Sequence, residues 1–434
     1  MNPLAVRIRR TYLVLVLGNT LAGSFIWGIN TLFLLDAGLT NLEAFAANAF
    51  FTAGMVVFEV PTGVVADTWG RRTSYLLGTV TLAVSTFLYW LLWEADAPFW
   101  LWALVSMALG LGFTFFSGAL EAWLVDALDF ARFDGELDKV LGQGQMVAGV
   151  AMLGGSLAGG VLAQATDLGV PFLVRTGVLV VMFLVAFLLM KDLGFVPEPG
   201  QRPLVAMRRV LRASLDHGLG NPPVRWVMLS APFAGGAGIY AFYAVQPYLL
   251  ELHHDPGAYS IAGLAAALVA GAQILGGWAA PRVRRLFARR TTTLILTAAG
   301  SALVLVLLGF APSLSVAIPL IALWGLLFAA DEPIRQAYLN DMIPSKQRAT
   351  VLSFDSLMGS SGGVVAQPAL GRAADVYGYA ASLVLSGLFA LLSVPFLIAS
   401  RRERPAADLA VRSGGGGSTE VQESRMPCDP MSGS

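Results

Sequence analysis

Four carboxylate side chains lie inside long apolar stretches of this sequence of 434 residues: Glu59, Glu121, Asp331 and Glu332. If these stretches cross a membrane, an ionised carboxylate within one costs at least ~2.5–3.5 kcal/mol, so each acid is a candidate for function. Burial also favours the protonated form of an acid. We therefore interpret Glu59 and Glu121 as candidates for binding and releasing a proton. The alternative is that their carboxylates simply reach the membrane surface.

A second group of polar residues surrounds the other two acids. Asp331 and Arg335 are separated by four residues, a spacing that lets them pair on one face of a helix. Glu332 would lie on the neighbouring face, and Gln336 follows directly after Arg335. We expect Asp331, Glu332, Arg335 and Gln336 to line a ligand cavity. A purely structural ion pair is the alternative.

Uncharged polar and aromatic residues in other apolar stretches are further candidates for the cavity wall. They are Asn19, Gln145, Tyr240, Tyr243 and Gln246. Aromatic rings with a few polar groups suit an amphiphilic organic molecule. Hydrogen bonds between packed helices, and ordinary core packing of the aromatic rings, explain the same residues in structural terms.

The stretch GVVADTWGRR at 63–72 follows an apolar run and is expected to form a tight turn between two helices at a membrane surface. Gly63 and Gly70 indicate close approach of the backbone there. Asp67 and Arg71 can form an ion pair across one helical turn. A plain polar turn is the alternative. The positive-inside rule alone would account for Arg71 and Arg72 but would leave both glycines and Asp67 unexplained.

The composition predicts an integral membrane protein. The chain is 56% hydrophobic and only 13% charged, whereas soluble domains carry roughly 25% charged residues. Its formal net charge is zero, which argues against a nucleic-acid partner. The single cysteine, Cys428, excludes an internal disulfide. No metal cluster, nucleophile elbow or phosphate-binding loop is visible, so we expect neither an enzyme nor a bound cofactor.

Apolar runs of membrane-spanning length recur along the chain and predict an all-α fold with twelve transmembrane helices. They lie near 11–35, 44–66, 73–94, 98–127, 140–163, 170–190, 226–251, 259–280, 291–311, 314–341, 349–370 and 377–400. Lys and Arg concentrate in alternate connections, and only Arg175, Arg335 and Arg372 lie elsewhere. By the positive-inside rule, the N- and C-termini are therefore both cytoplasmic.

The second half of the chain repeats the first. AWLVD at 122–126 corresponds to AYLND at 337–341, and Glu59, Gly63 and Arg71 correspond to Gln273, Gly277 and Arg285. Such repeats predict two six-helix bundles with a binding site between them near the middle of the membrane. The predicted divisions are an N-terminal bundle at 1–190, a cytoplasmic linker at 191–224, a C-terminal bundle at 225–400 and a disordered tail at 401–434.

The sequence resembles the major facilitator superfamily of secondary transporters over residues 8–400. The stretch at 63–72 is similar to that family's loop signature, while SGALEAWLVD at 117–126 and RATVLS at 348–353 are similar to the bacterial drug–proton antiporters. The antiporter pattern in the fifth span is partly present, because Ala151 and Ser156 replace a Gly and the Pro. The resemblance implies that Asp67, Arg71 and Asp126 form a charge cluster that holds the two bundles shut on the inner side.

These observations together predict a multi-pass protein of the cell (inner) membrane that works by alternating access as a monomer. We expect it to export small amphiphilic organic compounds, with the proton gradient as driving force and the lipid bilayer and a small-molecule substrate as its partners. A nutrient or sugar-type symporter or facilitator is the alternative. A membrane receptor that transports nothing, or an enzyme, fits the sequence least well.

Overall fold

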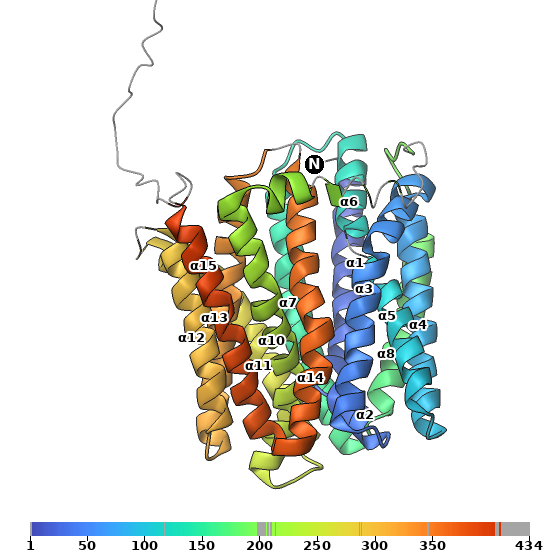
Figure 1. The fold of residues 1–434 in the computed structure, drawn as a ribbon. Coiled ribbons are helices and arrows are strands. Elements are labelled where there is room, and N and C mark those ends of the chain that lie inside the picture. Colours follow the sequence, from blue (N-terminus) through green and yellow to red (C-terminus); the bar gives the residue numbers. More distant parts are fainter. Residues whose placement is uncertain are drawn as a thin grey trace, which may run out of the picture.

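The computed structural model describes residues 2–116, 118–197, 205, 208, 211–212, 214–285, 287, 289–344, 347–403 and 408, and helices dominate this part of the chain (Figure 1). The first half contains α1 (Pro3–Trp27), α2 (Asn30–Asp36), α3 (Asn41–Trp69), α4 (Arg71–Glu94), α5 (Phe99–Thr114), α6 (Ala119–Phe130), α7 (Leu137–Ala165) and α8 (Val170–Leu189). The second half contains a π-helical turn (Leu215–Leu219), α10 (Pro222–His253), α11 (Tyr259–Arg285), α12 (Arg290–Gly309), α13 (Leu314–Asn340), α14 (Arg348–Leu391) and α15 (Ser393–Arg402).

The helices account for the predicted membrane crossings. In the described residues, ten helical segments are long and apolar enough to cross a membrane, and the pair α1 and α2, bent by 46°, forms an eleventh. One of the ten runs from Thr350 to Arg402 and contains Gly378, whose backbone is not helical (φ 79°, ψ 167°). The chain reverses direction there (Figure 1), so this segment supplies two crossings. The all-helical membrane fold predicted from the sequence is confirmed.

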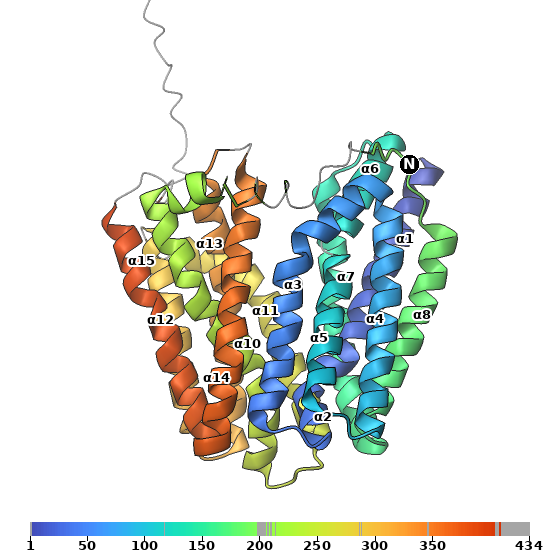
Figure 2. The same cartoon turned by 45° about the vertical axis from the view of Figure 1, so that its right-hand side comes forward.

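The helices form two groups, α1–α8 and α10–α15, that stand beside each other (Figure 2). In the first group α1 packs along α7 and α3 along α5, while in the second α10 packs along α14 and α11 along α13. The groups meet where α3 contacts α14 and α7 contacts α11. The N-terminus and the end of α15 lie at the same end of the molecule (Figure 1). Following the predicted orientation, we call this the inner end and the opposite end the outer end.

Local sequence explains where key helices begin and end. Thr40 and Glu43 form a capping box at the start of α3, in which the Glu43 carboxylate accepts from the Thr40 backbone N–H at 2.9 Å. Gly70 alone separates α3 from α4, with φ 102° and ψ 152°, a conformation that only glycine adopts readily. Small residues also allow helices to approach closely. A Cβ at Gly159 of α7 would lie 1.9 Å from the carbonyl oxygen of Phe25 in α1.

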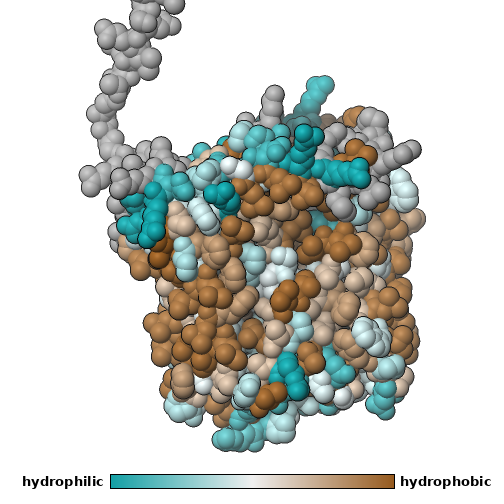
Figure 3. All heavy atoms as spheres, viewed as in Figure 1, coloured by the Kyte–Doolittle hydropathy of each residue, from teal (hydrophilic) through white to brown (hydrophobic). Residues whose placement is uncertain are grey.

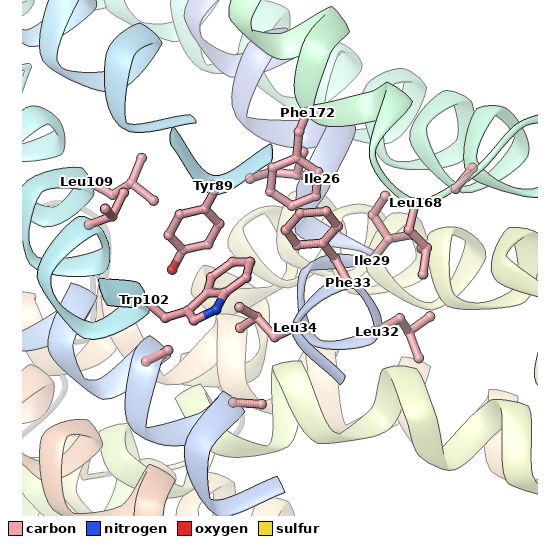
Figure 4. Packing of buried hydrophobic residues seen from close by; sticks show 14 of the residues in the cluster. Ile26, Ile29, Leu32, Phe33, Leu34, Tyr89, Trp102, Leu109, Leu168 and Phe172 are labelled. Atoms are coloured by element: carbon pink, nitrogen blue, oxygen red, sulfur yellow. The ribbon is translucent and has the colours of Figure 1, made fainter. Parts of the chain in front are cut away.

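The outer surface fits a bilayer. Apolar side chains cover the middle of the face seen in Figure 3, and polar side chains gather at its two ends. Leucine, valine and phenylalanine side chains exposed on α4, α8 and α12 would contact lipid. The outer part of the first group has its own aromatic core around Phe33 of α2 (Figure 4). The ring centroid of Phe33 lies 3.9 Å from that of Phe172 and 5.9 Å from that of Trp102, so α2 is fixed against α5 and α8.

Two predicted segments lie partly outside the described residues. The cytoplasmic linker predicted at 191–224 is described at 191–197, at a few positions beyond them and from residue 214, and α10 already begins at Pro222. The tail predicted at 401–434 is described only at 401–403, where α15 ends at Arg402, and at Asp408. Asp408 is buried, and its carboxylate accepts from the backbone N–H of Thr291 at 2.8 Å, at the start of α12. At this position the chain is therefore docked against the second group of helices.

Candidate functional site

A polar cavity of about 370 Å³ lies inside the second group, between α10, α12, α13, α14 and α15. The four residues predicted to surround the second pair of acids, Asp331, Glu332, Arg335 and Gln336, all contribute to its wall. The remaining polar residues of the wall are Thr297, Ser301, Asp355, Ser356, Ser360 and Ser393. Trp324 and Phe328 provide an aromatic side, so the cavity combines charged and apolar surfaces as an amphiphilic ligand requires.

Arg335 is fixed in this cavity by a two-pronged ion pair with Asp355. Its Nε and Nη2 donate to the two oxygens of Asp355 at 2.8 and 2.7 Å. Nη1 donates to the hydroxyl of Ser230 at 3.1 Å, and Nη2 also donates to the carbonyl oxygen of Val227 at 2.7 Å. Both ends of the ion pair are buried, and this bidentate geometry is the strongest that an arginine offers to a carboxylate.

The pairing predicted between Asp331 and Arg335 is therefore wrong. Asp331 instead accepts a hydrogen bond from the Thr297 hydroxyl of α12 at 2.5 Å, because the guanidinium of Arg335 is already paired with Asp355. Glu332 lies on the exposed side and accepts from the Gln336 amide at 2.7 Å. The sequence interpretation missed Asp355, although it lies in the predicted span 349–370 and the rule applied to the other buried acids would have identified it. With three carboxylates and one guanidinium, the cavity has a negative balance.

The two proton-binding candidates lie in the other group of helices. Glu59 is partly exposed on α3, and Glu121 is exposed in the first turn of α6. Neither contributes to the wall of the cavity around Asp331. The acids predicted to be functional thus fall into two places, one in each half of the chain.

The uncharged candidates also lie outside the wall of this cavity. Tyr240 is buried, and its hydroxyl donates to the hydroxyl of Ser382 at 2.6 Å. Asn19 accepts from the hydroxyl of Tyr75 at 2.8 Å. Gln145 is exposed on α7, and Tyr243 is partly buried on α10. The last of them, Gln246, belongs to a contact between the two halves.

Among the described residues, seven hydrogen bonds join the two halves, and all lie in the outer part of the molecule. Gln246 of α10 donates to the carbonyl oxygen of Trp27 at 2.7 Å and accepts from the backbone N–H of Thr31 at 3.1 Å. Asp375 of α14 accepts from the backbone N–H groups of Asn41 and Leu42, at 2.9 and 3.0 Å. The halves are therefore closed at the outer end, and their helices diverge toward the inner end (Figure 2).

Three further bonds complete this outer contact. The Tyr379 hydroxyl donates to the Asn41 side chain, and the Gln367 amide donates to the hydroxyl of Thr52 at 3.2 Å. The backbone N–H of Ser260 donates to the Gln164 side chain at 3.1 Å. Asn41 is thus held through both its backbone and its side chain by α14.

The charge cluster of the 63–72 loop is assembled at the inner end, within the first half. Arg71 pairs with Asp67, and its Nε lies 3.8 Å from Asp126 of α6. Arg72 donates from Nη2 to the carbonyl oxygen of Phe187 at 2.7 Å. Among the described residues, no hydrogen bond or ion pair of the cluster reaches the second half, so its role in closing the inner side stays a prediction. The close approach expected at Gly63 is not observed, because a Cβ there would meet nothing within 4 Å.

Asp192, which the sequence interpretation missed, completes this cluster. Its carboxylate accepts from the backbone N–H of Arg72 at 2.9 Å, at the start of α4, where a helix favours a negative charge. A Cβ at Gly70 would lie 2.4 Å from the same carboxylate, so this glycine is required both by its φ and by its neighbour. Burial raises the pKa of the Asp192 carboxyl above its usual range, while the hydrogen bond and the charges of Arg72 and Arg71 oppose that rise. The signal in the sequence was weak, since Asp192 lies in the polar segment after α8.

Comparison with known proteins gives one family. The family model described as Major Facilitator Superfamily matches residues 11–329 and 283–426. No curated protein matches the chain.

Solved structures share the fold at low sequence identity. A mutant of the nucleoside transporter NupG superposes with a TM-score of 0.79 at 11% identity, covering 92% of this chain and 99% of that one. A bacterial homolog of the human lysosomal transporter Spinster, in an inward-facing and occupied conformation, gives a TM-score of 0.74 at 13% identity, with 95% and 100% covered. The POT family transporter PepTSo gives 0.69 at 14% identity, with 92% and 98% covered.

Proposed function

We propose that this chain, which belongs to the Major Facilitator Superfamily, exports small amphiphilic organic compounds in exchange for protons. Its family makes it a secondary transporter in a membrane rather than an enzyme. The exchange with protons, the outward direction and the class of compound are the parts that we propose. We further propose that it works as a monomer in the cell membrane.

The observation that carries the proposal is the surroundings of Asp331 in the cavity wall. This residue lies well inside α13 and lines the cavity, and within the described residues it has no ion-pair partner, because Asp355 takes the only guanidinium of the wall. A carboxylate in such a place binds a proton more readily than one in water. A positively charged group entering the cavity would favour the ionised form and displace that proton. Competition of this kind is the simplest way to couple substrate binding to proton release.

The chemistry of the wall supports an amphiphilic substrate with a positive charge. Asp331 and Glu332 give the cavity its negative character, and Trp324 and Phe328 offer an apolar side that can also contact a cation. The likeness of 117–126 and 348–353 to drug–proton antiporters supports the outward direction. The halves are joined at the outer end, so this conformation would exchange ligands with the inner side, from which an exporter loads its substrate.

Glu59 and Glu121 keep a place in this proposal as proton carriers of the first half. Glu121 is exposed on α6 and lies within electrostatic reach of Tyr12 on α1. A proton that leaves Asp331 and a proton that passes Glu121 would take part in the same cycle at different steps. Variants at the two positions therefore separate substrate competition from proton conduction.

One observation favours uptake instead. The pattern of the fifth span departs from that of antiporters at Ala151 and Ser156, both of which are buried in α7. A symporter would bind substrate and proton together rather than in competition. The two candidates therefore differ in the sign of the proton signal when substrate binds.

The deciding measurement is the proton released or taken up when substrate is added to the purified protein in weakly buffered solution, followed by transport in vesicles with an imposed pH gradient. Cationic, neutral and sugar-like compounds would be compared. For an exporter we expect a cationic amphiphile to release protons, with the release lost in Asp331→Asn and transport impaired in Glu121→Gln. Asp138→Asn, at an exposed acid of α7, is the matched control. Proton uptake on binding, or gradient-insensitive uptake of a sugar-like compound, would refute export.

A further inference from the structure

Arg175 of α8 is a buried cation that the transport proposal does not use. Its relative exposure is 8%, and it lies in the outer half of a membrane-spanning helix. Within the part of the chain that the structure describes, its guanidinium forms no hydrogen bond and no ion pair, and its Nε is fully buried without a partner. The buried Arg335, in contrast, has four hydrogen bonds and a carboxylate.

A charge in this position needs compensation. Arginine does not lose its proton inside proteins, so the group cannot become neutral as a buried acid can. An uncompensated buried charge is strongly destabilising, and an apolar side chain of similar volume would avoid that cost. An arginine in this position is best explained by a ligand that supplies the missing negative charge.

The surroundings of Arg175 suit an anion. The groups that act electrostatically on its guanidinium are the hydroxyls of Tyr89 in α4 and Tyr243 in α10, and no carboxylate is among them. Tyr89 shares a hydrogen bond with Ser106, whereas no partner is found for the Tyr243 hydroxyl among the described residues. Thr86 precedes Tyr89 by one turn of α4, and its buried hydroxyl also has no partner. These are donors, and a guanidinium with nearby hydroxyl donors is the chemistry that binds anions.

We propose that Arg175 and Tyr243 form a buried site for a small, singly charged anion at the contact between the two halves. Arg175 belongs to the first half and Tyr243 to the second, so an anion bound by both strengthens the closed outer end. The anion comes either from solution, as a halide, or from the carboxylate of an organic substrate. This site is separate from the Asp331 cavity, and it stands whether or not the protein exports cations.

The test is the thermal unfolding midpoint of the full chain in detergent at constant ionic strength. Chloride, bromide, acetate and benzoate would each replace the bulky sulfonate anion of HEPES. We expect a small anion to raise the midpoint of the wild type by several degrees, because a ligand that binds only the folded state stabilises it. Arg175→Met should lose this response and, without small anions, should unfold at a higher temperature than the wild type.

Two further variants keep the result interpretable. Arg175→Lys retains the charge and should respond more weakly, while Arg132→Gln, at an exposed arginine, should respond like the wild type. A response to the halides supports an inorganic ion as the ligand, and a response to acetate or benzoate alone supports a substrate carboxylate. The proposal is overturned if no small anion stabilises the wild type, or if Arg175→Met responds equally.

Discussion

Replacing Asp375 by alanine should weaken the closure of the outer end. The Asp375 carboxylate binds the backbone N–H groups of Asn41 and Leu42, the first two residues of α3, at 2.9 and 3.0 Å. These N–H groups have no partner within their own helix, and the helix start also favours a negative charge. Both bonds cross between the halves, so they can exist only while the outer end is closed.

The size of the effect follows from these two bonds. A hydrogen bond to a charged group contributes about 1.5–3 kcal/mol, and water replaces part of this when the partner is removed. We take about 3 kcal/mol for the pair, which corresponds to a change of roughly 100-fold in the ratio of closed to open outer ends. The hydrogen bond between Tyr379 and Asn41 would remain. If 99% of the wild-type molecules are closed at the outer end, about half of the Asp375→Ala molecules would be open there.

Spin labels at the outer end would measure this change. Cysteines at Glu94 and His253, in a Cys428→Ser background, place one label on the exposed outer end of each half. Asp167→Ala is the matched control, since Asp167 accepts from the backbone N–H groups of Gly169 and Val170 at 2.8 and 2.9 Å entirely within the first half. Asp375→Ala should broaden the distance distribution toward longer values, and Asp167→Ala should not. An unchanged distribution in Asp375→Ala would refute the reasoning.

Three further predictions concern stability, measured by thermal or denaturant unfolding in detergent. Gly70→Ala should lower the free energy of unfolding by about 1–3 kcal/mol, because of the backbone conformation at this position. Gly63→Ala, with open space around the Cβ, should be neutral or stabilising by up to about 1 kcal/mol. Equal effects of the two substitutions would contradict this reasoning. Folding raises the pKa of the Asp192 carboxyl, so this group stabilises the fold less as the pH rises from acidic to neutral. Asp192→Asn should therefore gain stability relative to the wild type over that pH range. A stability difference between the two proteins that does not change with pH would exclude this titration as the cause. Arg335→Met and Asp355→Leu should each lower the free energy of unfolding by about 3–5 kcal/mol, because each leaves a buried charge alone. The double variant should lose much less than the sum of the two single losses. Simple additivity would show that the pair does not interact.

The fold could be predicted from the sequence because hydropathy and loop charge are set by the bilayer. Membrane helices satisfy their backbone internally, so each crossing has a length that a run of apolar residues reveals. The turn that contains Gly70 was also predictable, because the glycines of its stretch indicate a tight turn. The docking of Asp408 against Thr291 was not, because a single capping carboxylate in a polar tail has no periodic pattern.

The candidate site was only partly predictable, since pairing depends on which helices meet. Spacing along α13 suggested that Asp331 would bind Arg335, but α14 brings Asp355 to the same guanidinium with better geometry. Gln246 is polar and lies within a span, and the sequence alone could not separate a cavity residue from one that joins the halves. In each case the missing information was the neighbour across a helix interface.

The two ends of the molecule present different chemistry. The outer contact uses amide, hydroxyl and backbone groups together with the single carboxylate of Asp375. The inner end presents the cluster of Asp67, Arg71 and Asp126, in which the Nε of Arg71 is buried without a hydrogen-bond acceptor among the residues that the structure describes. An unpaired buried donor costs free energy, so the cluster is not fully satisfied in the conformation with the inner end open. Closure of the inner end can relieve this cost if the second half supplies an acceptor, and the bonds lost at the outer end are then offset by bonds to charged groups at the inner end.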